Sequence, residues 1–203
     1  MSDPAFRTLH ALRIKGFATA DTVSEIADVP VEVCTGHLAA LKERELANFV
    51  EARNLWRLTP AGKEHHLEVL VADIAATGAD EALAVDYHPF MAINERFKEL
   101  CGEWQLKDGQ PNDHTDATYD AAVIAKLVAL HNEAEPVVAA MGAAVPRFAP
   151  YAPRLAQTCR RVVEGETKMF TGVMCGSYHD VWMELHEDLI LTQRIDRSAE
   201  GSF

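Results

Sequence analysis

The order of secondary-structure signals in the first third of the chain constrains the fold more than any other feature. Apolar residues recur at helical spacing over residues 6–17, and two shorter helical stretches follow, separated near residues 29–30. The segment ANFVE then reads as a strand, residues 52–54 as a turn and LWRL as a returning strand. This stretch therefore predicts three short helices followed by a two-stranded hairpin.

Capping and turn signals separate these elements. Thr19 offers a hydroxyl N-cap to the second helix, and Val29-Pro30 is a natural turn before the third. Thr59-Pro60 opens a fourth helix with a cap and a proline at its first position. Helices and hairpin in this order predict a winged helix-turn-helix over residues 1–68, a fold whose third helix commonly enters the DNA major groove.

The string LTPAGKEHH, which closes the expected hairpin, carries a resemblance to a known family. Here the chain resembles the MarR-type and related winged-helix transcription regulators, in which a strand ending in "LT" and a "P-x-G" helix start close the wing. The resemblance covers about residues 5–68. It implies binding to double-stranded DNA, and we expect a homodimer that recognises a palindromic site.

The third helix and the hairpin supply the candidate DNA-binding residues. We expect Val33, Leu38 and Leu41 to form the buried stripe of that helix. Its opposite face carries no Arg, Asn or Gln for bidentate base contacts, so the same face also fits a protein-docking module. We assign base edges to Thr35 and His37, and phosphates to Lys42, Arg44, Arg53 and Arg57.

The charge is distributed unevenly along the chain. The formal net charge of −12 is the wrong sign for strong nonspecific binding to phosphates. Residues 1–68 hold ten acids against eight bases, whereas the remainder holds 21 acids against 11 bases. We therefore expect only the first part to meet DNA.

Beyond residue 68 the pattern is almost wholly helical, and we expect a second, all-helical domain over residues 69–203. Helical periodicity covers 69–78, 89–104, 117–135, 136–144, 153–164 and 178–194. Pro136 removes a backbone donor inside a long periodic stretch, so we expect it to kink the helix or start a new one. Residues 104–120 read as a polar surface loop or a functional lid, with Asp113 or Asp116 capping the next helix.

The last helix, SYHDVWMELHEDLILTQR, has the highest density of chemically active side chains. Its aromatic and imidazole face either belongs to the core or lines a ligand cavity. We expect the other side, with Asp180, Glu184, Glu187 and Asp188, to be a solvated acidic ridge. The candidate effector-binding residues of the helical domain are Trp104, His114, His179, Trp182 and His186.

Signatures of catalysis are missing from the sequence. It contains no Gly-rich phosphate loop, no GxSxG, and no HxxxH or HExxH pair. The four cysteines, which have no CxxC spacing, predict reduced thiols: Cys34, Cys101, Cys159 and Cys175. We therefore expect a protein that is not an enzyme and that needs neither a cofactor nor a metal.

A second resemblance lies in the helical region. The segments NERFKELCGEWQL, PNDHTDATYDAAV, APYAPRL and SYHDVWMELHEDL are similar to parts of a helical domain that accompanies some pyruvate phosphate dikinase-like and phosphoenolpyruvate-utilising proteins. It spans about residues 90–192. The chain lacks the nucleotide-grasp portion and any recognisable phosphohistidine motif of those enzymes, so the resemblance implies an association with their metabolism rather than their activity.

Two functions of different class follow from these patterns. The first is a dimeric transcription regulator whose helical domain holds a small-molecule effector. The alternative is a non-enzymatic accessory or regulatory subunit of a phosphoenolpyruvate- or pyruvate-handling enzyme that uses the winged helix for protein docking. No apolar run approaches the roughly 20 residues of a membrane span, and the N-terminus lacks a signal-peptide layout, so we expect a cytoplasmic protein with no membrane partner.

Overall fold

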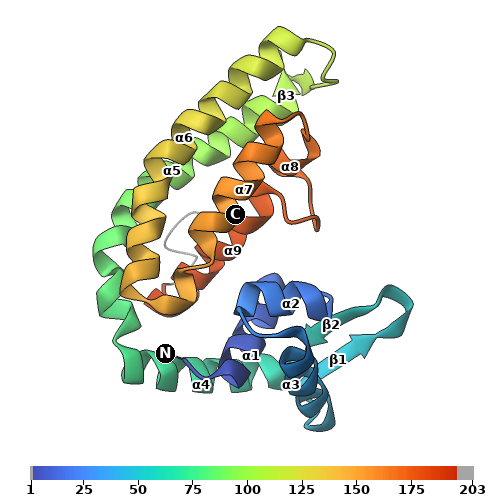
Figure 1. Cartoon of the computed structure of the whole chain (residues 1–203), viewed down its shortest axis with the longest axis vertical. Helices are drawn as coiled ribbons and strands as arrows, with labels where there is room; N and C mark the ends of the chain where they lie inside the picture. Colours follow the sequence, from blue (N-terminus) through green and yellow to red (C-terminus); the bar gives the residue numbers. More distant parts are fainter. Residues whose placement is uncertain (1, 196–203) are drawn as a thin grey trace.

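The computed structural model describes residues 2–195 and is mainly helical (Figure 1). Its long elements follow one another as α1 (Pro4–Lys15), α2 (Ala20–Ala27), α3 (Val31–Glu43), β1 (Ala47–Val50), β2 (Leu55–Leu58), α4 (Pro60–Thr77), α5 (Ala79–Gln105), α6 (Ala117–Ala144), α7 (Tyr151–Val163) and α9 (Tyr178–Gln193). Short elements join them: η1 (Glu51–Arg53), β3 (Leu106–Lys107), β4 (Gln110–Pro111), η2 (Pro146–Phe148) and α8 (Lys168–Thr171).

Figure 1 shows two groups of elements connected by α4. We call α1, α2, α3 and the β1–β2 hairpin the N-terminal bundle, and α5 to α9 the helical body. In the helical body α5 and α6 run side by side as a long antiparallel pair, and α7 and α9 pack along them. Each group has its own buried apolar cluster, one within residues 9–58 and the other within residues 79–189.

The local signals of the N-terminal bundle act as expected. The Thr19 and Thr59 hydroxyls accept hydrogen bonds from the amides of Thr22 and Gly62, which caps α2 and α4. β1 and β2 pair antiparallel from Ala47 opposite Leu58 to Val50 opposite Leu55. A mainly helical fold with this small two-stranded sheet is therefore confirmed.

The buried stripe of α3 differs from the one the sequence suggested. Cys34, Leu38 and Leu41 are buried, whereas Val33 is 44% exposed, so its assignment to the core is wrong. Residues 34, 38 and 41 are spaced by four and three positions and share one face of a helix. Val33 lies five positions before Leu38 and turns to the neighbouring face.

The helix α4 begins after the hairpin and continues to Thr77, so residue 68, the expected domain boundary, lies inside it. Its apolar residues Leu70 and Ile74 pack with Phe6 of α1 and Leu191 of α9. α4 ends at Gly78, which adopts the left-handed conformation at φ 66° before α5 begins. The only chain connection between the two groups therefore passes through Gly78.

The helix α6 is continuous across Pro136, so the proline does not start a new helix. Its buried residues Val123, Leu127, Leu130, Ala134, Val138 and Met141 keep one helical spacing on both sides of the proline. Packing of this unbroken face against the core outweighs the one backbone hydrogen bond that proline cannot make.

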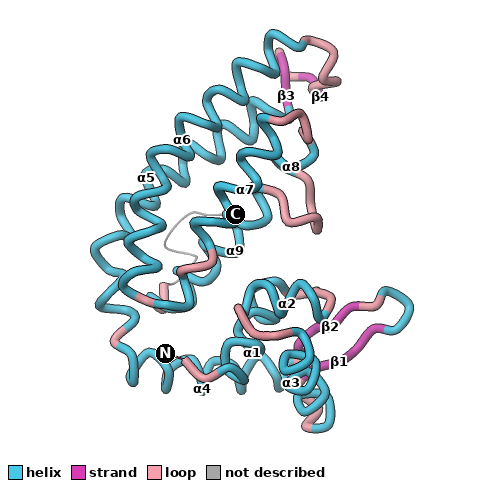
Figure 2. The backbone as a smooth tube through the Cα atoms, viewed as in Figure 1, coloured by secondary structure: helices cyan, strands magenta, loops and turns pink. Residues whose placement is uncertain are grey.

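The region beyond α4 is not all-helical, because β3 and β4 form a second, very short antiparallel hairpin between α5 and α6 (Figure 2). The carboxylate of Asp116 accepts hydrogen bonds from the amides of Thr118 and Tyr119 and caps α6. Of the two candidate caps, Asp113 and Asp116, the second is therefore confirmed. Within residues 2–195, no helix combines the length and apolar character that a membrane crossing requires.

Candidate functional site

The outward face of α3 is made of small and acidic side chains. Glu32, Gly36, Ala39, Ala40 and Glu43 are all exposed there. Thr35 is exposed beside this face, but its hydroxyl donates to the carbonyl oxygen of Val31 at 2.8 Å. Lys42 is exposed near the end of the helix.

Two of the candidate DNA-binding residues turn toward neighbouring helices. The Nδ1 atom of His37 lies 3.0 Å from the hydroxyl of the buried Thr8 on α1, so the ring is half-buried rather than on the outward face. The guanidinium of Arg44 lies 3.4 Å from Nε2 of His65 on α4. Sequence spacing placed His37 near the outer face, but its partner on α1 comes from 29 residues earlier.

The β1–β2 hairpin carries the other two candidates. Arg53 is exposed in the turn η1, next to Asn54, which has φ 53°. Arg57 is exposed on β2, and its guanidinium lies 5.9 Å from the ring centroid of Phe17. Arg53 and Arg57 are the two cations of residues 47–58, and both are exposed.

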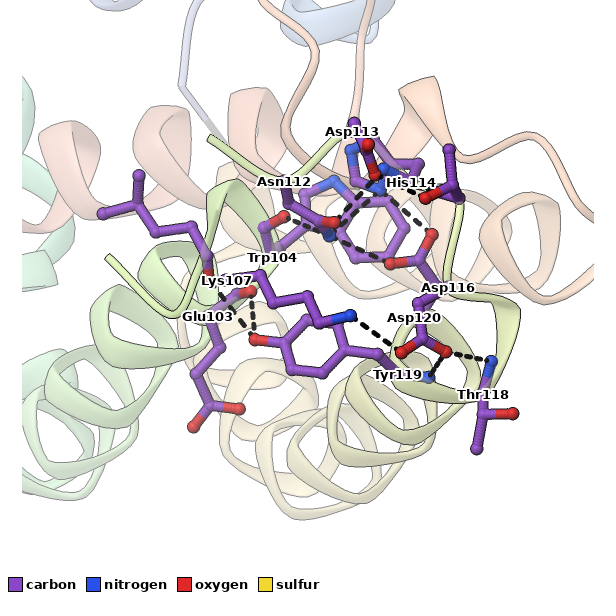
Figure 3. A network of polar contacts seen from close by, with 12 residues as sticks. Glu103, Trp104, Lys107, Asn112, Asp113, His114, Asp116, Thr118, Tyr119 and Asp120 are labelled. Atoms are coloured by element: carbon purple, nitrogen blue, oxygen red, sulfur yellow. Dashed lines mark hydrogen bonds and ion pairs between the residues drawn. The ribbon is translucent and has the colours of Figure 1, made fainter. Parts of the chain in front are cut away.

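Two of the five candidate effector residues meet at the far end of the α5–α6 pair (Figure 3). The rings of Trp104 and His114 lie 4.5 Å apart, and Trp104 also packs on Phe170. Nδ1 of His114 is 3.0 Å from a carboxylate oxygen of Asp120, whose other oxygen accepts from Asn112 at 3.0 Å. This network therefore connects the loop between β4 and α6 to α5 through Trp104 and to α6 through Asp120.

The other three candidates lie together on the face of α9 that packs on α5. Trp182 is fully buried, and its indole nitrogen donates to the side-chain oxygen of Asn94 at 2.9 Å. His179 and His186 lie against Phe97 and Phe90, at ring distances of 6.2 and 5.6 Å. The five candidates thus form two separate groups, at the tip and along the α5–α9 contact.

The acids of α9 do not form a solvated ridge, because they face α1. Lys15 and Arg154 both bind the carboxylate of Glu184, each at 2.6 Å, and the Glu184 side chain is only 4% exposed. Arg13 pairs with Glu187 at 2.9 Å. The predicted ridge is wrong because a basic stripe on α1, far away in sequence, covers it.

A chain of buried imidazoles continues this contact. Nε2 of His10 lies 2.9 Å from Asp188, and Nδ1 of His10 lies 2.8 Å from Nε2 of His66 on α4. Nδ1 of His66 has no hydrogen-bond partner among residues 2–195. Burial, followed by the charge at His10, lowers the pKa of His66 to about 3.

Asp188 collects the remaining contacts from η2 and α7. The Tyr151 hydroxyl donates to it at 3.1 Å, and Arg147 reaches it at 3.4 Å. Arg147 also pairs with Asp73 of α4 at 3.5 Å and donates to Thr192. Burial opposes ionisation of Asp188, but His10 and Arg147 outweigh it, so its pKa is lowered to about 2. We call the contact of α1 and α4 with α9, η2 and α7 the junction.

A cavity of about 360 Å³ opens beside the junction. Thr22 and Leu55 line it from the N-terminal bundle, and Arg154, Thr158 and Cys175 line it from the helical body. None of the five sequence-based effector candidates lines it. A second cavity of about 430 Å³ on the other side of Lys15 includes His186.

The sequence did not identify His10, His66, Lys15 or Arg154 as site residues. A signal was present, because the polar face of α1 is basic and that of α9 is acidic, and opposite charges on two helices favour pairing. In the described part of the chain, no group of three or more His, Cys, Asp or Glu side chains is arranged to hold a metal ion.

Comparison of the chain with protein-family models, with curated proteins and with solved structures found no match.

Proposed function

We propose that this protein is a transcription regulator that binds double-stranded DNA through a winged helix-turn-helix of the MarR type. The observation that carries the proposal is the placement of α3. It packs on the core through Cys34, Leu38 and Leu41, leaves its opposite face in solvent, and is followed directly by a hairpin with an exposed arginine at its turn. In this function α3 lies in the major groove and Arg53 contacts the phosphate backbone.

A homodimer is part of the proposal. A single α3 offers few base contacts, because its outward side chains are small or acidic. Two copies related by a two-fold axis double these contacts and require a palindromic site.

We place the small-molecule effector in the 360 Å³ cavity, whose volume is within the usual range for ligand sites. Leu55 belongs to the hairpin and Thr22 to α2, while Arg154 and Thr158 belong to α7. A ligand there touches the N-terminal bundle and the helical body at once, so it can alter the orientation of α3 and the hairpin.

Selection of fragments from a random DNA pool by the purified protein tests the proposal, at low and at near-physiological salt. We expect enrichment of a palindromic site. Arg53→Ala should weaken binding to all sequences alike and reduce the slope of log affinity against log salt by about 1. Arg96→Ala is the matched control, because Arg96 on α5 is exposed and pairs with Glu133 on α6. It should change neither the affinity nor the salt slope. If no sequence is enriched, and if the wild type and Arg53→Ala bind the pool equally well, DNA recognition by this protein is contradicted.

A second function is favoured by one specific observation. Gly36, Ala39 and Ala40 give α3 a flat outward face flanked by Glu32 and Glu43, which suits close packing against a protein better than base reading. In this function the protein is an accessory subunit of a phosphoenolpyruvate- or pyruvate-handling enzyme.

The substitution Ala39→Arg separates the two functions. An added cation on the outward face should strengthen DNA binding through phosphate contacts. If α3 docks on an enzyme, the same bulky side chain should abolish co-purification with that enzyme, tested in turn against each phosphoenolpyruvate- or pyruvate-handling enzyme of the source organism.

A further inference from the structure

The junction between the N-terminal bundle and the helical body is held mainly by charged and polar side chains. From α1, His10, Arg13 and Lys15 each bind an acid of α9. Interfaces of this polar kind within one chain resemble transient protein contacts, for which relative motion is the default. The chain connection past the junction is Gly78, whose φ is 66° and whose Cβ position has no neighbouring atom within 4 Å. Gly78 therefore has room to act as a hinge.

The buried imidazole pair has space for a single hydrogen between its two rings. His10 needs a hydrogen on Nε2 to bind Asp188, and only one hydrogen fits in the 2.8 Å contact between Nδ1 of His10 and Nε2 of His66. When His10 donates from both ring nitrogens, a proton added to Nε2 of His66 places a second hydrogen in this contact, and the N–H at Nδ1 of His66 has no acceptor among residues 2–195.

The groups that face His66 add to this penalty. His10 and Arg13 approach from α1, and Arg147 approaches from η2. The opposing charge of Asp188 on α9 is already bound by His10, Arg147 and Tyr151. Asp73, on α4 itself, is paired with Arg147, and the ring of Phe6 covers His66 on the remaining side. A charged His66 is therefore incompatible with the closed junction.

We propose that the His10–His66 pair is a proton-sensitive latch: uptake of a proton by His66 separates α1 and α4 from α9, and the N-terminal bundle swings away from the helical body about Gly78. This device goes beyond the proposed function and does not depend on it, because it requires neither DNA nor an effector.

The sign of the pH dependence follows from proton linkage. The pKa of His66 is lowered to about 3 in the closed junction and returns to about 6.5 when water reaches the ring. The open form therefore binds the extra proton between these values, and opening becomes more favourable as pH falls below 6.5. The equilibrium constant for opening should rise about 30-fold from pH 7.5 to pH 5.

Single-molecule energy transfer measures the opening directly. Fluorophores are attached through unnatural amino acids at Ala52 on η1 and Ala125 on α6, both exposed, in the full chain without DNA. We expect the ratio of low-transfer to high-transfer molecules to rise about 30-fold from pH 7.5 to pH 5. A chain that stays in the high-transfer state throughout this range overturns the latch.

Two variants assign the effect to His66. His66→Gln keeps an amide that donates to Nδ1 of His10 but cannot titrate, so its populations should not respond to pH. His65→Gln is the matched control, because the neighbouring imidazole lies outside the latch, 3.6 Å from the carboxylate of Glu68. It should follow the wild type. Equal pH responses in His66→Gln and the wild type overturn the proposal.

A measurement on the unmodified chain covers the case in which His66→Gln fails to fold. Nitrogen NMR of the histidine rings reports the protonation of each imidazole. We expect the closed form to keep His66 neutral at pH 5. A charged His66 in the closed form contradicts the proposal.

Discussion

Gly62 lies where the first turn of α4 touches the chain leaving α3. A Cβ atom at this position would lie 1.9 Å from the carbonyl oxygen of Leu46. That oxygen is held in place because it accepts a hydrogen bond from the Thr59 amide at 3.0 Å. Gly62→Ala should therefore lower the free energy of unfolding by about 3 kcal/mol or more, measured by urea denaturation.

Gly36 is the matched control for this substitution. It also lies in a helix, but its Cβ position has no neighbouring atom within 4 Å. Gly36→Ala should raise the free energy of unfolding by up to about 1 kcal/mol, because alanine loses less backbone entropy in a helix. Equal losses in both variants would contradict the packing explanation for Gly62.

At the scale of single residues, the sequence predicted what depends on near neighbours. Thr19, Thr59 and Asp116 cap their helices as expected, since a cap binds amides only two or three positions away. It did not predict that His37 binds Thr8, or that Glu184 is buried. Those contacts join elements far apart in sequence, and spacing along the chain does not show which helices meet.

At the scale of elements, α9 is buried on two sides. Its aromatic face packs on α5 through Trp182, and its acidic face packs on α1 through Glu184 and Asp188. Periodicity identified both faces of this helix correctly. It assigned the acidic one to solvent because an acidic stripe is usually solvated, whereas the basic stripe of α1 covers this face together with Arg147 and Arg154.

Glu184 should contribute more to stability than any exposed acid. Glu184→Gln leaves Lys15 and Arg154 partly buried without the carboxylate that they share. We expect the free energy of unfolding to fall by about 2–4 kcal/mol, measured by urea denaturation. Glu133→Gln removes an exposed ion pair with Arg96 and should leave stability unchanged. If both substitutions changed the free energy of unfolding by a similar amount, burial of the Glu184 ion pairs would make no additional contribution to stability.

At the scale of the whole molecule, the sequence predicted a mainly helical chain with a small hairpin after the third helix, and this is the fold observed. The arrangement of the two groups was not predictable. Their main apolar clusters are separate. Apart from the small cluster of Phe6, Leu70, Ile74 and Leu191, the two groups meet through charged and polar side chains, which apolar periodicity does not reveal. The cavity was not predictable either, because its walls come from elements far apart in sequence, namely α2, β2, α7 and α9.

The two main apolar clusters are separate, so the contacts of the junction are what can couple the unfolding of the two groups. We expect the junction to make unfolding cooperative. Of the three tryptophans, Trp56 lies in the N-terminal bundle, and Trp104 and Trp182 lie in the helical body. Protein labelled with 5-fluorotryptophan therefore reports both groups in one fluorine NMR spectrum. In the wild type, we expect all three native signals to disappear over one temperature range.

The double substitution Glu184→Gln and Glu187→Gln removes two partners of α1 from α9. The Trp56 signal should then disappear several degrees below the other two, because the N-terminal bundle loses the support of the helical body while each apolar cluster stays intact. Three signals that still disappear together would show that the apolar contact of α1, α4 and α9 alone couples the two groups.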